Sequence, residues 1–173
     1  GWHDIIMSPD CRHYVDSWSR IDVPRVTDLC TSSGKVVKNL LSADDPTEEY
    51  AYTEISLGTV RSADGKYMNY YRLIKPKDFD PAKEYPVIVY VYGGPHSQLV
   101  TNTFMSGGTF LYYMAQQGYV IFTLDNRGTA NRGAEFEKCI HRHLGDLEVE
   151  DQMCGVEYLK SLPYIDAKRI GLD

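Results

Sequence analysis

Apolar and polar residues follow two different patterns along this chain, and the change lies near residues 42–54. Before that point, short β-prone runs are separated by turn residues, which is typical of antiparallel strands. After it, longer apolar runs alternate with stretches in which apolar residues recur every three or four positions, which indicates strands alternating with helices. The chain therefore predicts two kinds of β structure in succession.

The first pattern predicts a small array of short strands. Residues 4–19 read as a hairpin around the turn Ser8-Pro9-Asp10, and β-prone runs follow at 25–29 and 36–41. This spacing suggests part of an all-β array such as a propeller blade. One blade cannot bury its faces alone, because repeat units rely on their neighbours for a continuous core. Residues 1–45 are therefore assigned to the C-terminal segment of a β-propeller.

The second pattern, residues 46–173, predicts a doubly wound parallel sheet that is incomplete. A polar connector (44–49) precedes a hairpin (54–60 and 66–75), strands at 87–92, 119–125 and 168–173, and helices at 103–117, 133–142 and 146–162. The first helix would face the core with Phe104, Leu111 and Met114, and the last with Met153, Val156 and Leu159.

Composition excludes several classes of function. The 173 residues carry a formal net charge of −6 without a concentrated basic stripe, so no nucleic-acid partner is expected. No apolar run approaches the ~20 residues of a transmembrane helix, and the start of the chain does not read as a signal peptide. The four cysteines (Cys11, Cys30, Cys139 and Cys154) lack zinc-site spacing and are expected to be buried free thiols, with a Cys11–Cys30 disulfide possible only if their strands meet.

The run at residues 85–95 carries the strongest chemical signal. It reads as a strand covered on both faces that stops at Gly93-Gly94-Pro95, and open α/β sheets bind ligands at the carboxyl ends of such strands. Tyr92 lies at the strand exit, where its phenol could donate a hydrogen bond to a developing oxyanion. The alternative is a tyrosine packed at the sheet end, with its hydroxyl satisfied by backbone.

Residues 125–133 leave the next strand at the same edge. They lack the Lys-Ser/Thr of a phosphate-binding loop and the Gly-x-Gly-x-x-Gly dinucleotide pattern, so no nucleotide cofactor is expected. Asp125 and Arg127 are predicted to form an ion pair that holds this loop.

The histidines and the acidic helix give weaker signals. His141 and His143 are two residues apart and would point to different helix faces, so no shared metal is expected. His96 lies beside the glycine loop, but a general-base role would need a serine within reach, and adjacency of Ser97 does not supply that geometry. Glu148, Glu150 and Asp151 are predicted to form a solvated acidic face.

Taken together, an ordered set of motifs resembles the dipeptidyl peptidase IV family of the prolyl oligopeptidase clan of serine peptidases. The motifs are Tyr70-Tyr-Arg-Leu-Ile-Lys-Pro76, residues 85–95, Asp125-x-Arg-Gly128, Arg142-His-Leu-Gly145, Glu148-Val-Glu-Asp-Gln152 and Arg169-Ile-Gly171. The resemblance implies a propeller joined to an α/β-hydrolase domain that releases Xaa-Pro dipeptides from peptide N-termini. It also implies that Tyr92 is the oxyanion-stabilising tyrosine.

The chain departs from the family pattern in one respect that concerns catalysis. In α/β-hydrolases the triad follows in the order Ser, Asp, His, with the serine at an elbow directly after a strand. The family continues after the strand at 168–173 with Gly-Trp-Ser-Tyr-Gly-Gly, and no Gly-x-Ser-x-Gly occurs in this chain. The expected fold class is thus an incomplete α/β-hydrolase sheet, truncated before the nucleophile elbow and preceded by propeller strands. We expect the chain alone to be inactive.

Other functions remain open from the sequence. The chain could come from another peptidase of the clan, such as an acylaminoacyl peptidase or an oligopeptidase, or from a non-enzymatic binding module with a partial hydrolase fold. Peptide substrates of the full-length protein are the expected partners, and neither a cofactor nor a metal is expected. An unfinished sheet exposes a strand edge, so homo-oligomers or self-association are predicted. The resemblance implies an extracytoplasmic enzyme, either periplasmic or at the cell surface.

Overall fold

The computed structural model describes residues 1–48 and 54–173, so Glu49, the last residue of the predicted connector, lies outside the described residues. The described chain divides into two compact units. The first comprises residues 1–48 together with Thr101–Ser106, and the second comprises 54–100 and 107–173. Each unit is described separately below.

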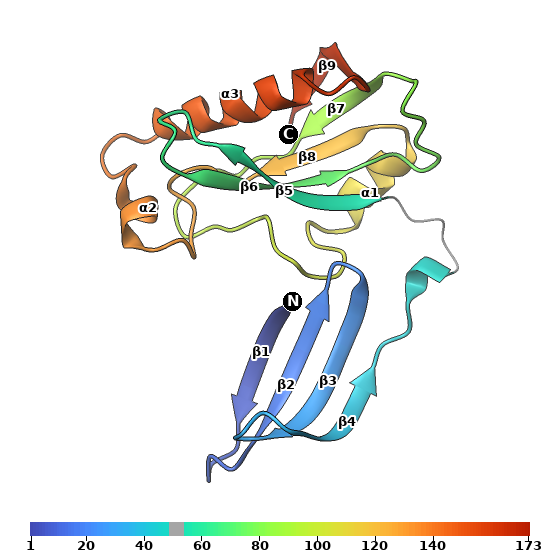
Figure 1. Ribbon diagram of the computed structural model, residues 1–173, viewed down its shortest axis with the longest axis vertical. Coiled ribbons are helices and arrows are strands. Elements are labelled where there is room, and N and C mark those ends of the chain that lie inside the picture. Colours follow the sequence, from blue (N-terminus) through green and yellow to red (C-terminus); the bar gives the residue numbers. More distant parts are fainter. Residues whose placement is uncertain (49–53) are drawn as a thin grey trace. The chain divides into compact units, whose positions relative to one another are not determined.

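The first unit is an antiparallel sheet of four strands in the order β1-β2-β3-β4 (Figure 1). The strands are β1 (Trp2–Met7), β2 (His13–Arg20), β3 (Val23–Thr31) and β4 (Val36–Ser42), and a 3₁₀ turn, η1 (Pro46–Glu48), follows. Residues 101–106 join this unit through Asn102, whose Oδ1 accepts a hydrogen bond from the Ile21 amide at 2.9 Å. The predicted hairpin and both further strands are thus present.

The four-stranded sheet leaves much of its apolar surface exposed. Exposed large apolar residues are Trp2, Ile5, Ile6 and Met7 on β1, and Val36, Val37, Leu40 and Leu41 on β4. Cys30 is buried as expected, but the expectation was wrong for Cys11, which is exposed in the turn between β1 and β2. All four cysteines are free. Edge strands with this much apolar surface need a further layer to cover them.

The second unit is a mixed sheet of five strands in the order β5-β6-β8-β7-β9. Its elements are β5 (Ile55–Arg61), β6 (Met68–Ile74), β7 (Tyr85–Val89), α1 (Thr109–Gln116), β8 (Val120–Leu124), α2 (Ala134–Lys138), α3 (Leu147–Lys160) and β9 (Ile165–Leu172). β7 pairs in parallel with both β8 and β9, while β5 and β6 form an antiparallel hairpin that adds to β8. This is the partial α/β-hydrolase sheet that the sequence predicts.

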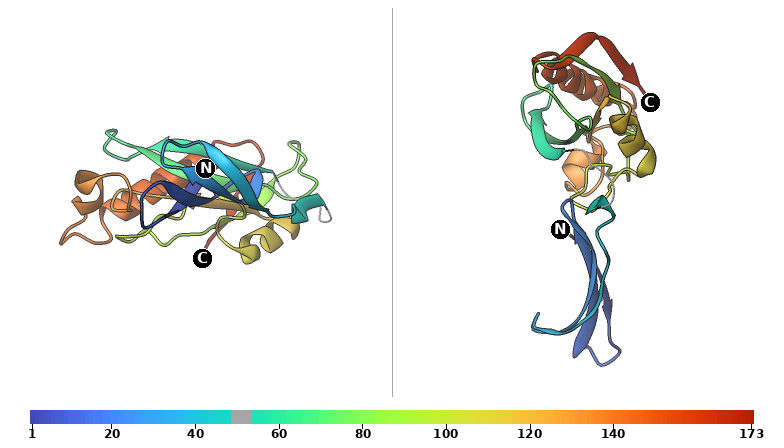
Figure 2. Two further views of the ribbon diagram at one scale, coloured as in Figure 1. Left: turned by 90° about the horizontal axis from the view of Figure 1, so that it is seen from below. Right: turned by 90° about the vertical axis from the view of Figure 1, so that its right-hand side faces the viewer.

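Helices α1 and α3 lie on opposite sides of this sheet (Figures 1 and 2). The chain moves from β7 to β8 in one direction and from β8 to β9 in the other, so right-handed crossovers place the two connecting helices on opposite faces. Leu159 of α3 is completely buried against a core that includes Val87 and Phe122. Alternate residues of β8 therefore face different helices.

Several boundaries and one core assignment differ from the sequence prediction, and helix α2 ends at Lys138 rather than at 142. Helix α1 begins at Thr109 rather than near 103, because residues 101–106 belong to the first unit. Met153 was wrongly assigned to the core and is 49 % exposed, whereas Leu159 is fully buried. The strand predicted from 168 begins at Ile165. Among the described residues, no helix is both long and apolar enough to cross a lipid bilayer.

Candidate active-site loops at the carboxyl edge of the sheet

The loop after β7 carries Tyr92 at the carboxyl edge of the parallel strands. The Tyr90 amide donates to the Phe122 carbonyl at 2.8 Å, and the Val91 amide donates to the Asp173 carbonyl at 3.1 Å. The backbone is thus held between β8 and the end of β9 up to the residue before Tyr92. The Tyr92 side chain itself is 65 % exposed, which disagrees with the alternative of a packed tyrosine.

The loop after β8 is buried and fixed by hydrogen bonds. The carboxylate of Asp125 accepts the amides of Leu99 and Val100 at 3.0 and 2.9 Å. Burial raises the pKa of Asp125, and these two amides partly oppose that shift. Asp125 therefore fixes the segment that follows the glycine loop. The predicted ion pair between Asp125 and Arg127 is wrong, because Asp125 is engaged with these amides and Arg127 turns to other carboxylates.

Arg127 connects the loop after β8 to helix α3. Its Nε and Nη2 donate to the carboxylate of Asp151, with Nη2 at 2.8 Å from Oδ1, and its backbone amide donates to the same carboxylate at 2.9 Å. Its Nη1 also lies 3.1 Å from Asp64. The hydrogen bonds to Asp151 raise the pKa of Arg127 above its usual value. The prediction of a solvated acidic face is wrong for Asp151, whose exposed fraction is 0 %.

Asn126 joins this loop to the loop that bears Tyr92. Its Nδ2 donates to the Gly93 carbonyl at 3.0 Å, and its Oδ1 accepts from Gln152 of α3 at 2.8 Å. Gly93 has φ +70°, and a Cβ at this position would lie 3.1 Å from Oδ1 of Asn126. Glycine thus gives both the left-handed backbone and the space for this contact.

Tyr92 lines a pocket of about 340 Å³. Its walls come from the glycine loop, from Asn126 and from the start of α3, where Glu148 accepts the Gly145 amide at 3.1 Å. Four of the motifs that carry the resemblance, at residues 85–95, 125–128, 142–145 and 148–152, thus contribute to one pocket.

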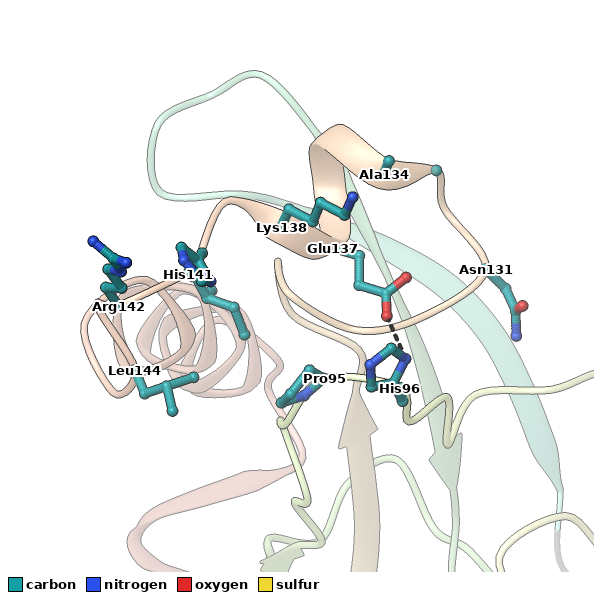
Figure 3. A pocket seen from close by; sticks show the side chains of 11 residues that line it. Pro95, His96, Asn131, Ala134, Glu137, Lys138, His141, Arg142 and Leu144 are labelled. Atoms are coloured by element: carbon teal, nitrogen blue, oxygen red, sulfur yellow. Dashed lines mark ion pairs between the residues drawn. The ribbon is translucent and has the colours of Figure 1, made fainter.

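A second pocket, of about 610 Å³, adjoins the first and shares Pro95 and Leu144 with it (Figure 3). Nδ1 of His96 lies 2.9 Å from Oε1 of Glu137 on α2, and the His96 side chain is 90 % exposed. His141 also lines this pocket, while Nδ1 of His143 lies 4.0 Å from Asp146. Nδ1 of His96 thus pairs with a carboxylate, and among the described residues no hydrogen bond joins its imidazole to the Ser97 hydroxyl, as activation of that serine would require.

The sequence interpretation gave Asn126 no role and quoted Gln152 only as part of a motif. Asn126 stands between the two residues of the predicted ion pair, and Gln152 follows directly after the acidic residues of α3. Both are sequence neighbours of residues that the sequence analysis discussed as an ion pair or as an acidic face. Their contacts join segments 26 and 33 residues apart, so only the fold brings them together.

These elements define an α/β-hydrolase class of structure, with a candidate oxyanion-stabilising tyrosine at the expected strand exit. The model of the prolyl oligopeptidase family matches residues 106–173. Human dipeptidyl peptidase 8 is 32 % identical over 182 residues, an alignment that covers 98 % of this chain and 20 % of the relative. Mouse prolyl endopeptidase FAP is 39 % identical over 109 residues, covering 63 % of this chain and 14 % of the relative.

Solved structures agree with the sequence relatives. A Bacteroides ovatus protein described as a dipeptidyl aminopeptidase IV superposes with a TM-score of 0.95 at 48 % identity, over 99 % of this chain and 24 % of that one. Dipeptidyl peptidase 4 of Porphyromonas gingivalis gives a TM-score of 0.89 at 32 % identity, over 98 % and 24 %. The chain belongs to the prolyl oligopeptidase family, and its similarity lies with the dipeptidyl peptidase IV branch. The chain spans 20 % of dipeptidyl peptidase 8, 14 % of FAP and 24 % of each of the two solved chains.

Proposed function

We propose that this chain is a segment of a serine exopeptidase that releases Xaa-Pro dipeptides from the N-termini of peptides. In the full-length protein the reaction is acyl transfer through a serine ester, which water then hydrolyses. The chain contributes late propeller strands (1–45) and the first part of the hydrolase sheet (46–173). The serine, aspartate and histidine of the triad are proposed to lie in the part of the protein that follows Asp173.

The position of Tyr92 carries the proposal. It follows β7, which lies between its two parallel neighbours β8 and β9, and the residue is 65 % exposed at the carboxyl edge. In a doubly wound sheet, the nucleophile of an α/β-hydrolase follows a neighbouring strand at the same edge. A phenol at this position can donate to the oxygen that becomes negative when the serine attacks the substrate carbonyl. Tyr92 is thus proposed as the side-chain donor of the oxyanion hole.

Substitution Tyr92→Phe in the full-length protein tests this role. It removes only the hydroxyl, and loss of one oxyanion donor typically lowers kcat by about 10²–10³-fold. We expect that loss with a Gly-Pro chromogenic substrate and little change in KM. Tyr113→Phe, at an exposed tyrosine of α1, is the matched control and should leave kcat unchanged. An unchanged kcat in Tyr92→Phe would exclude the proposed role.

The isolated chain is proposed to be inactive, because nucleophile and base lie outside it. Release of dipeptide from a Gly-Pro reporter by the purified 173-residue chain would contradict this. Profiling the full-length product on substrates with free and blocked N-termini separates a dipeptidyl peptidase from an acylaminoacyl peptidase or an oligopeptidase. The motif at residues 148–152 favours the dipeptidyl peptidase.

Self-association and an extracytoplasmic location are further parts of the proposal. β9 forms one edge of its sheet, and Leu172 near its end is 77 % exposed. Such an edge, together with the apolar residues of β1 and β4, favours association of the isolated chain. A sharp monomer peak of the isolated chain by light scattering would contradict self-association. Fractionation of cells that express the full-length protein tests the extracytoplasmic location.

A further inference from the structure

The loop that carries Tyr92 has two anchors, one on each side of the tyrosine. The Val91 amide, before it, bonds to the Asp173 carbonyl at 3.1 Å. The Gly93 carbonyl, after it, accepts Nδ2 of Asn126 at 3.0 Å. Glycines 93 and 94 leave the backbone with few steric restraints of its own, so the second anchor has a large share in fixing the conformation that follows Tyr92.

The orientation of the Asn126 carboxamide is set by a chain of hydrogen bonds that starts on the sheet. Nε2 of Gln152 donates to the Leu124 carbonyl at 2.9 Å, and a carbonyl can only accept. The same Nε2 lies 2.8 Å from Asn126, which must therefore present its oxygen to Gln152. The Asn126 amide nitrogen is then left to face the Gly93 carbonyl.

Asn126 and Gln152, which form this series of hydrogen bonds, are both held in place by further contacts. Asn126 has an exposed fraction of 0 %, and its Nδ2 also donates to the Arg127 carbonyl at 2.6 Å. Gln152 follows Asp151, whose carboxylate binds the Arg127 amide and guanidinium. Consecutive residues of α3 thus fix both the backbone of the loop after β8 and the direction of its amide donor.

We propose that Asn126, oriented by Gln152, is a positioning residue that holds the Gly93 carbonyl and thereby places the Tyr92 phenol for catalysis. This inference rests on the proposed function of Tyr92. Neither amide needs to touch the substrate. Their effect on the reaction passes through the position of the loop, so it should depend on the presence of the Tyr92 hydroxyl.

The test uses Asn126→Asp in the full-length protein, since aspartate keeps the shape but removes the donor to Gly93. Misplacement of a catalytic group costs up to about 10²-fold, so we expect kcat on a Gly-Pro chromogenic substrate to fall about 10- to 100-fold with KM little changed. Gln152→Glu should also lower kcat, because it removes the amide donor that orients Asn126. Asn102→Asp keeps the acceptor that binds the Ile21 amide, and it should leave kcat unchanged.

A double-variant cycle with Tyr92→Phe separates positioning from a general structural role. If Asn126 acts through the phenol, Asn126→Asp should lower kcat by less than about twofold in the Tyr92→Phe background, because coupled residues are not additive. Multiplication of the two losses would overturn the inference.

Hydrogen–deuterium exchange of the amides at 93 and 94 gives a readout that does not depend on activity. We expect faster exchange in Asn126→Asp, confined to this loop, and unchanged exchange would overturn the inference. If Tyr92→Phe alone leaves kcat unchanged, the proposed function fails, and the exchange result still decides whether Asn126 holds the loop.

Discussion

The loops after β7 and β8 leave the same edge of one sheet, yet they differ in almost every physical property. The loop after β7 presents an exposed tyrosine next to two glycines. The loop after β8 contains Asp125, Asn126 and Arg127, which are at most 5 % exposed and are bound to α3 and to backbone amides. The two loops thus differ in role. The loop after β7 keeps Tyr92 accessible, and the buried loop after β8 supplies the rigidity that a precise site requires.

Breaking the buried loop should give the largest effect. Asp151→Ala leaves the Arg127 guanidinium without its main partner inside the protein, and breaking a buried pair costs about 3–5 kcal/mol. Urea unfolding of the full-length protein measures this loss. Glu150→Ala is the control, because Glu150 binds the same guanidinium from a side chain that is 56 % exposed and should contribute below about 1 kcal/mol. Equal losses in the two variants would refute the distinction.

Changing the exposed loop should cost less in stability but should affect activity. Gly93→Ala places a Cβ 3.1 Å from Oδ1 of Asn126 in a backbone with φ +70°, and we expect a loss of about 1–2 kcal/mol with a lower kcat. Gly65→Ala has a similar φ of +74° but no atom within 4 Å of the added Cβ. It should therefore show only the backbone cost. A normal kcat in Gly93→Ala would argue against a tightly placed loop.

The smallest effect concerns acid. The Ser62 hydroxyl, the Lys66 amide and Arg127 hold the pKa of Asp64 below its ordinary value. Its contribution to stability is therefore present above the unfolded pKa, near pH 4, and is lost as the pH falls through the lower folded value. Asp64→Asn should reduce stability at pH 6 by less than about 1 kcal/mol, because water screens this partly exposed carboxylate. The gap between the unfolding curves should close near pH 3. A gap that widens in acid would show that the sign is wrong.

The period of apolar residues was enough to predict the elements of both units. Val120–Leu124 is buried throughout, and it reads as a continuous apolar strand in the sequence. The resemblance also pointed to Tyr92 at the strand exit, and its catalytic role stays a prediction. These features depend on local sequence, which is why they could be read before the fold was known.

The hydrogen-bond and ion-pair partners of the charged residues could not be predicted from the local sequence. Asp125 and Arg127 are two residues apart, and a local pairing was the simplest expectation. In the fold Asp125 bonds with amides 25 and 26 residues away, and Arg127 with a helix residue 24 away. The burial of Asp151 was not predicted for the same reason, because a run of acidic residues on a helix is typical of a solvent-exposed face. Only the packing of α3 on the sheet decides which carboxylate turns inward.

Residues 101–106 have a consequence for exchanging parts between related proteins. They lie in sequence within the hydrolase half but belong to the first unit, where Asn102 binds the Ile21 amide and the Phe104 amide lies 3.4 Å from Oγ of Ser19. A chimera made with one crossover near residue 45 would pair this segment with a foreign sheet. Recombination between relatives should therefore succeed more often when residues 101–106 travel with the propeller strands.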